Sequence, residues 1–410
     1  MDHPRVYAGS AEELLEHLVA GGPTETSTNI LDLDELVSNV YRWKEAHPGL
    51  TPFYSPCVNN HPLVLSVLEK LAVGFSCASR KEMCTVLGMG VPAGRVWLAH
   101  PCKTPDAILC AQQNQIDRIA CDSVQEVAKV LRLHPTARIV LRIRLHPEQK
   151  FGCCPTVDLP EILNFARSAS ARIVGVHVAI PQGKEHLEEP LAWLGRGLRE
   201  AKATIEHAHR MGLNELQELV LSGVDHVPPA ALQSELTALS LPTAVTVIIE
   251  TDRALVESAV TLVTNVQSKR VIRHAGLSSQ LVQEIMYFLN DGRYGSFEWW
   301  KAIDKPPTVR RMNETGSPAT ATNCPHWPTS LWGPTCDSAD IICERLELPE
   351  LEVGDFLVFR AMGAYGATVA SRFNGFPIPR TVACARHETT RALLDDNQTL
   401  VPIPRPAEHN

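Results

Sequence analysis

Short apolar segments recur along the first two thirds of the chain, with a helix-like segment between each pair. Candidate strands start about 21 to 22 residues apart, near Pro52, Val73, Arg95, Asp117 and Arg138. Three more follow at wider intervals, over residues 172–178, 217–222 and 245–250. Parallel strands need a helical crossover between neighbours, so this alternation predicts a closed parallel sheet surrounded by helices. The expected fold is α/β, a TIM (β/α)8 barrel.

The segments between these strands carry helical patterns. Residues 61–71 place apolar side chains at helical spacing, and residues 190–211 are long and amphipathic. Ser123 is followed three residues later by Glu126, which is the pattern of a capping box at a helix start. These helices are the crossovers that a parallel barrel requires.

The pattern changes after about residue 257. Residues 260–266, 271–274 and 353–359 resemble strands that lack crossover helices. Gly, Pro and Asn gather between such segments, as is typical of turns in an antiparallel sheet. The sequence therefore predicts a second, mostly antiparallel β-domain after the barrel.

Domain boundaries follow from these two patterns. We expect the barrel to span residues 28–257 and the β-domain to combine residues 1–27 with 258–394. Within the β-domain, the loop at 312–328 is expected to be the least ordered part. The polar, Pro-rich residues 395–410 are expected to form a disordered tail.

Charge and hydropathy exclude several classes of partner. The 410 residues carry a net charge of -8 and no long basic run, which argues against nucleic acid and anionic membranes. No window of about 18 apolar residues predicts a membrane-spanning helix, and the N-terminal residues lack the pattern of a signal peptide. We expect a cytoplasmic protein that contacts neither nucleic acid nor membrane.

The twelve cysteines follow neither a disulfide framework nor a metal-binding spacing. No C-x-x-C motif occurs, and no histidines stand beside the cysteines at helical spacing. The adjacent pair Cys153–Cys154 leaves a redox role open, but reduced thiols packed as small apolar side chains are expected. No bound metal is expected.

Chemistry in TIM barrels takes place at the carboxyl ends of the strands. The residues at those ends are Cys57, Cys77, His100, Asp122, Arg142, His177, Ser222-Gly223, and Glu250 with Arg253. Glu250 and Arg253 are the pair with a clear cofactor use, since a carboxylate holds a pyridinium nitrogen and an arginine pairs with a phosphate. A solvated loop salt bridge explains the same two residues, and both interpretations stay open at this point.

Distinctive motifs run along the chain from about residue 5 to residue 390. They include Pro52-Phe53-Tyr54, Phe75-Ser76-Cys77-Ala78-Ser79, Pro101-Cys102-Lys103, Lys150-Phe151-Gly152, Asn290-Asp291-Gly292, Trp332-Gly333-Pro334-Thr335-Cys336-Asp337, Met362-Gly363-Ala364-Tyr365 and Phe373-Asn374-Gly375-Phe376. Together they resemble the eukaryotic ornithine decarboxylase family of pyridoxal-phosphate decarboxylases, which also includes the antizyme inhibitors, relatives that share the fold but lack decarboxylation. The resemblance implies a barrel plus a β-domain and, in the enzymes, active sites formed between two subunits.

On the β-domain side, the residues that the resemblance implies are present. Cys336 matches the catalytic cysteine that protonates the decarboxylated carbanion, and Asp337 matches the carboxylate that binds the substrate amine. Tyr365 matches a phosphate-binding tyrosine. Without a carbanion to protonate, Cys336 is expected to be idle, as a packed or interfacial thiol.

On the barrel side, this chain departs from the family pattern. Cys57 stands in the position of the lysine that forms a Schiff base with the cofactor, and Ala179 in that of a histidine that stacks on the cofactor ring. Ser76 replaces an aspartate. The glycine-rich phosphate loop has become Ser222-Gly223-Val224-Asp225, of whose glycines Gly223 remains. The remnants expected to face a cofactor are Gly223, Arg142, Glu250, Arg253 and Tyr365.

These replacements predict a degenerate, catalytically inactive relative with no bound cofactor. It would act in polyamine (putrescine) metabolism as an antizyme-inhibitor-like regulator, or persist as a vestigial paralogue. The alternative is an active pyridoxal-phosphate-dependent, ornithine-like amino-acid decarboxylase with an altered site. Candidate partners are antizyme, an ornithine decarboxylase-type subunit and a second copy of this chain.

The resemblance also implies where antizyme would bind. The basic helix-strand-helix surface that antizyme contacts in the family matches residues 104–132 here. This segment keeps Lys129 and Arg132 but has Leu109 in place of a lysine. Because charge steers such contacts, the sequence predicts a weakened antizyme surface.

Overall fold

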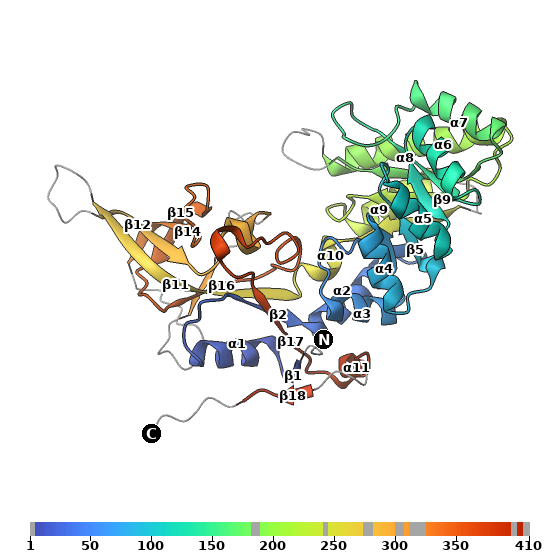
Figure 1. Cartoon of the computed structure of the whole chain (residues 1–410). Coiled ribbons are helices and arrows are strands. Elements are labelled where there is room, and N and C mark those ends of the chain that lie inside the picture. The colour runs from blue at the N-terminus through green and yellow to red at the C-terminus, as the bar shows by residue number, and fades with distance from the viewer. Residues whose placement is uncertain are drawn as a thin grey trace. The chain divides into compact units, whose positions relative to one another are not determined.

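The computed structural model describes residues 5–181, 189–240, 245–273, 282–299, 307–310, 325–394 and 400–404. The chain divides into two compact units (Figure 1). One comprises residues 1–39, 58–67 and 255–410, and the other residues 40–57 and 68–254.

The second of these units contains a closed parallel barrel, as the strand spacing predicts. Its strands are β3 (Thr51–Tyr54), β4 (Gly74–Cys77), β5 (Val96–Leu98), β6 (Arg118–Cys121), β7 (Arg138–Ile143), β8 (Arg172–Ala179), β9 (Glu218–Ser222) and β10 (Thr246–Glu250). They pair in chain order, and β10 closes the ring on β3. The prediction of a TIM barrel is confirmed.

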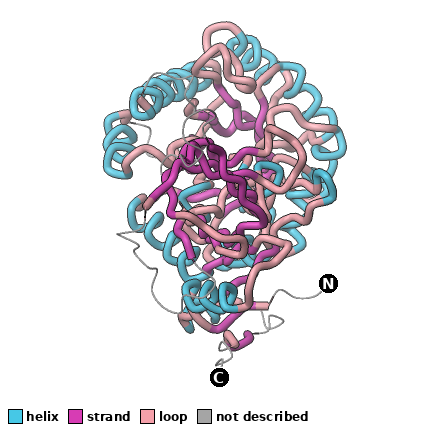
Figure 2. Tube along the Cα trace, turned by 90° about the vertical axis from the view of Figure 1, so that its left-hand side faces the viewer, coloured by secondary structure: helices cyan, strands magenta, loops and turns pink. Residues whose placement is uncertain are grey.

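Helices follow the barrel strands and lie outside them (Figure 2). They are α3 (Pro62–Lys70), α4 (Arg80–Gly88), α5 (Pro105–Gln113), α6 (Val124–Leu133), α7 (Asp158–Ser168), α8 (Pro190–Arg210), α9 (Pro229–Ala238) and the short α10 (Arg253–Val256), with α2 (Leu33–Ala46) before β3. The helices predicted at 61–71 and 190–211 are thus confirmed. The Ser123 hydroxyl caps α6 by accepting the N–H of Glu126 at 3.2 Å.

The barrel interior is filled by side chains that point inward from successive strands. One buried cluster consists of Phe53, Trp97, Ala120, Val140, Val174, Val220 and Ile248. Such a layer makes the barrel a packed core rather than a channel, so functional side chains are left to the strand ends.

The other unit contains a mixed, largely antiparallel sheet, and the predicted fold class is confirmed. Its strands are β1 (Val6–Ala8), β2 (Thr28–Asp32), β11 (Val260–Arg273), β12 (Val282–Leu289), β13 (Thr308–Arg310), β14 (His326–Trp332), β15 (Ile341–Pro349), β16 (Phe356–Phe359), β17 (Arg380–Cys384) and β18 (Leu400–Pro402). The main path runs β15-β14-β12-β11-β2-β17-β1-β18, and β16 pairs with β11 and β13.

Helix α1 (Ala11–Ala20) packs its apolar side chains on this sheet. Its N-terminus has a complete capping box, in which Ser10 and Glu13 satisfy each other's backbone N–H groups. The buried cluster here comprises Leu14, Leu15, Val19, Ile30, Val263, Phe356, Val358 and Cys384. Residues from both ends of the chain therefore build one core. Two short helical segments, 293–297 and 373–375, and α11 (Glu388–Arg391) complete the unit.

Two sequence-based assignments differ from the structure at the edges of the domains. Residues 28–32, assigned to the barrel, form β2, which pairs with β11 and β17 in the β-domain sheet. A strand followed by α2 has the same order as a barrel unit, so the pattern alone could not separate them. In the tail at 395–410, residues 395–399 and 405–410 lie outside the described part. Residues 400–402 form β18, parallel to β1, so the prediction of disorder is wrong for them.

Other local differences concern the later strands. The segments predicted at 260–266 and 271–274 are one strand, β11, with a register shift between Val266 and Ser268. The polar residues 267–270 separate the two apolar segments in the sequence, which is why they resemble two strands. Residue 274 lies outside the described residues. In the loop predicted at 312–328, residues 312–324 also lie outside them, whereas residues 326–328 begin β14.

Candidate functional site

Three adjacent strands place side chains in one row at the carboxyl end of the barrel. Glu250 ends β10 and pairs in register with Ser222 at the end of β9. Ser222 pairs in turn with Ala179 at the end of β8. The register of the parallel strands thus brings residues of three predicted site segments together.

His177 lies two residues earlier in β8 and is almost fully buried. Its Nε2 lies 2.9 Å from the Ser222 hydroxyl and 3.6 Å from Glu250 Oε2. Its ring makes an edge contact with Trp97 at 5.5 Å between centroids. The indole of Trp97 donates to the Ser76 hydroxyl at 2.6 Å. A continuous polar cluster therefore fills the barrel beneath this row.

Burial decides the protonation of this cluster. It raises the pKa of the Glu250 carboxyl, although hydrogen bonding to Ser76 and the charge of Arg142 act in the opposite direction. Burial also lowers the pKa of His177 well below its ordinary value, and the Arg142 charge adds to this effect. The imidazole is therefore neutral at neutral pH, and its contact with Glu250 is no ion pair.

Some polar atoms of the cluster lack a partner. Glu250 Oε1, His177 Nδ1 and Arg142 Nε are buried without a hydrogen bond to protein. Buried polar groups are normally satisfied, so this corner suits an ordered water or the polar group of a small ligand. Glu250 and Arg142, two of the predicted remnants, do face the same region.

Cys57 follows β3, at the mouth of the barrel. Its side chain is exposed on one side and enclosed on the other. This partial burial, together with the carboxyl groups of Asp252 and Glu82, raises the pKa of the thiol to about 12. Cys57 is therefore a protonated thiol at neutral pH, and a weak nucleophile.

Two aspartates of the neighbouring loops are drawn inward beside it. Asp252 Oδ1 accepts the backbone N–H of Ser55 at 2.9 Å, and Asp225 Oδ2 accepts that of Arg253 at 3.2 Å. Burial has the largest effect on the pKa of Asp252, and the negative charge of Glu250 adds to it; together they raise this pKa to about 8. Burial also raises the pKa of Asp225, against hydrogen bonds from the backbone N–H groups of Asp252 and Arg253.

The loop that precedes Asp225 contains one residue with a positive φ angle. Gly223 has φ +77°, in the region that favours glycine, and the chain then turns so that Val224 is buried and the Asp225 carboxyl points back to Arg253. Of the predicted remnants, Gly223 and Arg253 are thus held in neighbouring loops through Asp225.

The other residues at the strand ends have local roles. Cys77 is buried at the end of β4, and burial raises its pKa. His100 Nδ1 accepts the Cys102 N–H at 3.0 Å, and its ring meets Phe151 at 5.2 Å. Asp122 accepts the Gly152 N–H at 2.9 Å. These contacts fix loops and leave the row from Ala179 to Glu250 as the candidate site.

The β-domain unit carries the remaining predicted residues. Cys336 is exposed in the loop after β14. The next residue, Asp337, accepts the Ala339 N–H at 2.9 Å and the hydroxyl of Tyr294. These two hydrogen bonds lower the pKa of Asp337, so it is a carboxylate at neutral pH. The structure therefore presents a thiol and a charged carboxylate side by side in one loop.

Tyr365 lies on a separate turn of the same unit. Its backbone has φ +57°, an uncommon value for a residue with a side chain, and its N–H donates to the carbonyl of Val58 at 2.9 Å. The ring lies 5.8 Å from that of Trp299. The backbone contacts therefore account for the strained turn without a ligand.

Asp340 and Gly333, which are not among the predicted site residues, hold the loop of Cys336 and Asp337. Asp340 is buried and accepts N–H groups from Arg293 and Thr335, at 2.8 and 2.9 Å. A Cβ atom at Gly333 would lie 2.2 Å from its carboxylate, so only glycine fits there. Sequence reasoning missed Asp340 and Tyr294, because nothing local in the sequence shows which polar groups a loop carboxylate will meet.

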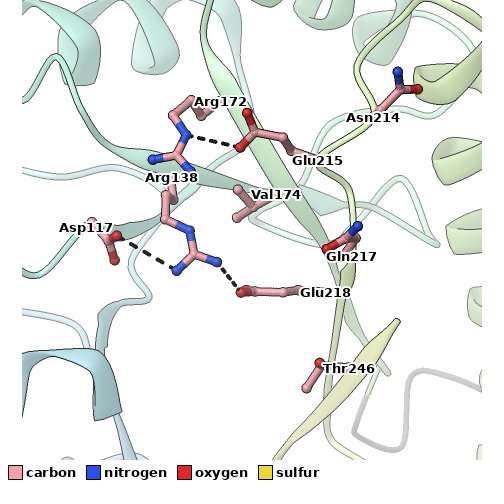
Figure 3. Close-up of a pocket in the computed structure, with 9 residues that line it drawn as sticks. All are labelled: Asp117, Arg138, Arg172, Val174, Asn214, Glu215, Gln217, Glu218 and Thr246. Carbon is pink, nitrogen blue, oxygen red and sulfur yellow. Dashed lines mark hydrogen bonds and ion pairs between the residues drawn. The ribbon is translucent and has the colours of Figure 1, made fainter. Parts of the chain in front are cut away.

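A second cluster of charges lies at the amino ends of β7–β10, around a hollow of about 530 Å³ (Figure 3). Glu218 accepts two hydrogen bonds from Arg118 and one from Arg138, at 2.7 to 3.0 Å. Nearby, Arg172 pairs with Glu215 at 3.0 Å on the surface. Because each of these arginines is paired with a glutamate, this end of the barrel is a structural ion-pair network.

Two kinds of site were also sought over the described residues. They contain no group of three or more His, Cys, Asp or Glu side chains arranged to hold a metal ion. None of the helices seen in the structure has the length and apolar character to cross a bilayer.

Comparison with known proteins identifies the family. Residues 33–224 match the pyridoxal-binding domain of pyridoxal-dependent decarboxylases. The chain is 33% identical to the chloroplastic ornithine decarboxylase of Nicotiana glauca over 366 residues, which cover 85% of this chain and 81% of that protein. It is 32% identical to antizyme inhibitor 2 of Xenopus laevis, with 85% and 78% covered.

Solved structures agree with these relatives. The lysine/ornithine decarboxylase of Vibrio vulnificus, solved in complex with putrescine, superimposes with a TM-score of 0.77 at 25% identity, over 93% of this chain and all of that one. The chain belongs to the pyridoxal-dependent decarboxylase family that includes ornithine decarboxylase and antizyme inhibitor 2.

Proposed function

We propose that this chain is a catalytically inactive relative of ornithine decarboxylase that acts in the cytoplasm, in polyamine metabolism, through contacts with other proteins. The observation that carries the proposal is Cys57, a protonated thiol in the position of the Schiff-base lysine. Only an amine forms an imine with the cofactor aldehyde, and the nearest lysines in the sequence are Lys44 and Lys70.

The phosphate side of the site also argues against pyridoxal phosphate. Asp225, in the former phosphate loop, already accepts the backbone N–H of Arg253 at 3.2 Å and a hydrogen bond from the backbone N–H of Asp252. A phosphate would find these donors occupied and would meet a carboxyl group. Glu250 still offers an unpartnered oxygen that suits a protonated ring nitrogen, but Ala179 offers no ring to stack on it. Taken together, the residues present do not fit the cofactor.

The surface matched to antizyme binding has lost much of its positive charge. Residues 104–132 contain three basic side chains. Arg118 is paired with Glu218, and Lys129 with Glu126 at 2.7 Å, whereas Arg132 is exposed. Lys129 also donates to the carbonyl of Lys103, whose own ammonium is buried against Glu126 at 2.9 Å. We therefore propose that antizyme binds this chain more weakly than it binds the active decarboxylase.

Cofactor binding and turnover test the inactive state. Purified protein is titrated with pyridoxal phosphate, reduced with borohydride and examined by mass spectrometry, and release of labelled carbon dioxide from ornithine is measured. We expect neither a reduced adduct nor turnover. Labelled carbon dioxide from the unmodified chain would contradict the proposal and favour an active, ornithine-like decarboxylase.

Variants test the effects of Cys57 and Asp225 separately. Cys57→Lys restores an amine, and Cys57→Met is a control of similar size without one. We expect Cys57→Lys to stay inactive because Asp225 still occupies the phosphate donors, and the double variant Cys57→Lys with Asp225→Gly to gain affinity for pyridoxal phosphate. If Cys57→Lys alone restores turnover, the rest of the site is sound and the argument from Asp225 is wrong.

Binding assays distinguish a regulator from a vestigial paralogue. The purified chain is mixed in turn with antizyme and with active ornithine decarboxylase, and complexes are measured by light scattering after gel filtration. A complex with antizyme that releases the active enzyme supports the antizyme-inhibitor-like role. If the chain forms only homodimers or stays monomeric, that role is excluded.

A further inference from the structure

Two cysteines face each other across neighbouring helices on the outside of the barrel. Cys84 lies in α4 and is exposed, and Cys110 lies in α5 with 5% of its surface exposed. Their sulfur atoms are 3.7 Å apart. We propose that Cys84 and Cys110 are a redox modification site, which low-molecular-weight disulfides such as oxidised glutathione convert into an intramolecular disulfide.

The geometry requires only a small rearrangement. A disulfide bond is about 2.05 Å long, so the two sulfur atoms must approach by about 1.7 Å. Rotation of the exposed Cys84 side chain supplies most of this movement. Cys110 is held in place, because the side-chain amide of Asn114 contacts both its carbonyl, at 2.8 Å, and its sulfur, at 3.6 Å.

The chemistry is thiol–disulfide exchange in two steps. Cys84, the accessible thiol, loses its proton to solvent and attacks one sulfur of oxidised glutathione, which forms a mixed disulfide and releases one glutathione thiolate. Cys110 then loses its proton and attacks the Cys84 sulfur, which releases the second glutathione. One glutathione disulfide is reduced to two thiols, and one protein disulfide forms.

The surroundings of Cys110 suit the second step. Burial has the largest effect and raises the pKa of Cys110, and the hydrogen bond with Cys84 raises it further. Arg80, one turn before Cys84 in α4, lowers it. The resting thiol is therefore protonated, and once Cys84 carries glutathione its hydrogen bond no longer opposes ionisation. The guanidinium of Arg80 then stabilises the attacking thiolate.

The disulfide would link α4 covalently to α5, where the surface matched to antizyme binding (residues 104–132) begins. Residues 84 and 110 close a loop that contains β5 and the first turn of α5. A reducing cytoplasm keeps the pair as thiols at rest, so the crosslink marks oxidising conditions. This modification does not depend on the proposed function.

Peptide mapping tests the proposal on the full chain. Trypsin cuts after Lys81, Arg95, Lys103 and Arg118, which places Cys84, Cys102 and Cys110 on three separate peptides. After exposure to a glutathione redox buffer and alkylation of free thiols, we expect peptides 82–95 and 104–118 to be joined. Peptide 96–103, with the exposed Cys102, serves as the internal control and is expected to carry glutathione or remain free.

Two variants test the order of the steps. Cys110→Ser should trap glutathione on Cys84, and Cys84→Ser should leave Cys110 unmodified. Relative to Cys84→Ser, the oxidised native chain should melt about 5 °C higher. The proposal is overturned if Cys84 of the native chain accumulates glutathione without crosslinking, if either cysteine pairs with a different one, or if both stay free while Cys102 reacts.

Discussion

Asp252 illustrates how burial changes a single carboxyl group. The sequence gives no sign that its side chain turns inward. In the structure it accepts the N–H of Ser55 at 2.9 Å, and burial raises its pKa to about 8. The identities of Cys57 and Ala179 were legible in the sequence because they concern the residue type alone. The inward turn of Asp252 was not, because it depends on the packing of two loops.

This raised pKa predicts a pH dependence of stability. In the unfolded chain the carboxyl titrates near its ordinary value of about 3.9, so between about pH 4 and pH 8 the folded state holds a proton that the unfolded state releases. The stability that this group contributes is complete at low pH and is lost as the pH rises through 8.

Substitution of Asp252 by asparagine removes the titration but keeps an oxygen that accepts the Ser55 N–H. We expect Asp252→Asn to melt at the same temperature as the native chain near pH 4, and at a higher temperature near pH 8. Thermal unfolding measured across this range checks it, with the exposed Glu45→Gln as control. A parallel pH dependence of variant and native chain would show that Asp252 is ionised in the folded state.

At the scale of elements, the parallel barrel strands are held together at their amino ends by ion pairs as well as by backbone hydrogen bonds. Glu218, at the start of β9, links Arg118 of β6 and Arg138 of β7, and Figure 3 shows its contact with Arg138. The strand spacing predicted these elements, because parallel strands alternate with helices. It did not predict the ion pairs, because Arg118 and Glu218 are one hundred residues apart in the chain.

The same region offers a matched pair of substitutions. Glu218→Gln removes the negative charge that two partly buried guanidinium groups share, and only Arg138 keeps a second carboxylate, Asp117 at 3.8 Å, so we expect it to lower the free energy of unfolding by about 2 to 3 kcal/mol. Glu215→Gln breaks a pair in which both side chains are about half exposed, and we expect a change below about 0.5 kcal/mol. Chemical denaturation of both variants measures this, and similar losses would mean that burial does not set the strength of these pairs.

At the scale of the whole molecule, the barrel is an insertion between two parts of the β-domain. Both neighbours of β17 come from the start of the chain, β2 on one side and β1 on the other. The sequence assigned residues 1–27 to the β-domain, but it could not place β2 and β18 in the sheet, because three- to five-residue strands carry little periodicity.

This connectivity predicts which fragments fold. Residues 33–257 contain all the barrel strands, and we expect them to unfold cooperatively on heating. Residues 258–410 lack β1 and β2, and we expect no cooperative transition until a peptide of residues 1–32 is added. Circular dichroism during heating measures both. A cooperative transition of residues 258–410 alone would show that the N-terminal strands are dispensable.

The pairing of β1 with β17 and β18 also bears on synthesis in the cell. The ribosome makes β1 before the barrel, yet its partners at Val6↔Ala383 and Val6↔Leu400 emerge roughly 380 to 390 residues later. At about 5 to 20 residues per second, this delay lasts roughly 20 to 80 seconds. For most of this delay, the apolar side chains of α1, among them Leu14 and Leu15, lack core partners that come from β11, β16 and β17. We therefore expect the nascent chain to expose an apolar surface that the folded protein buries.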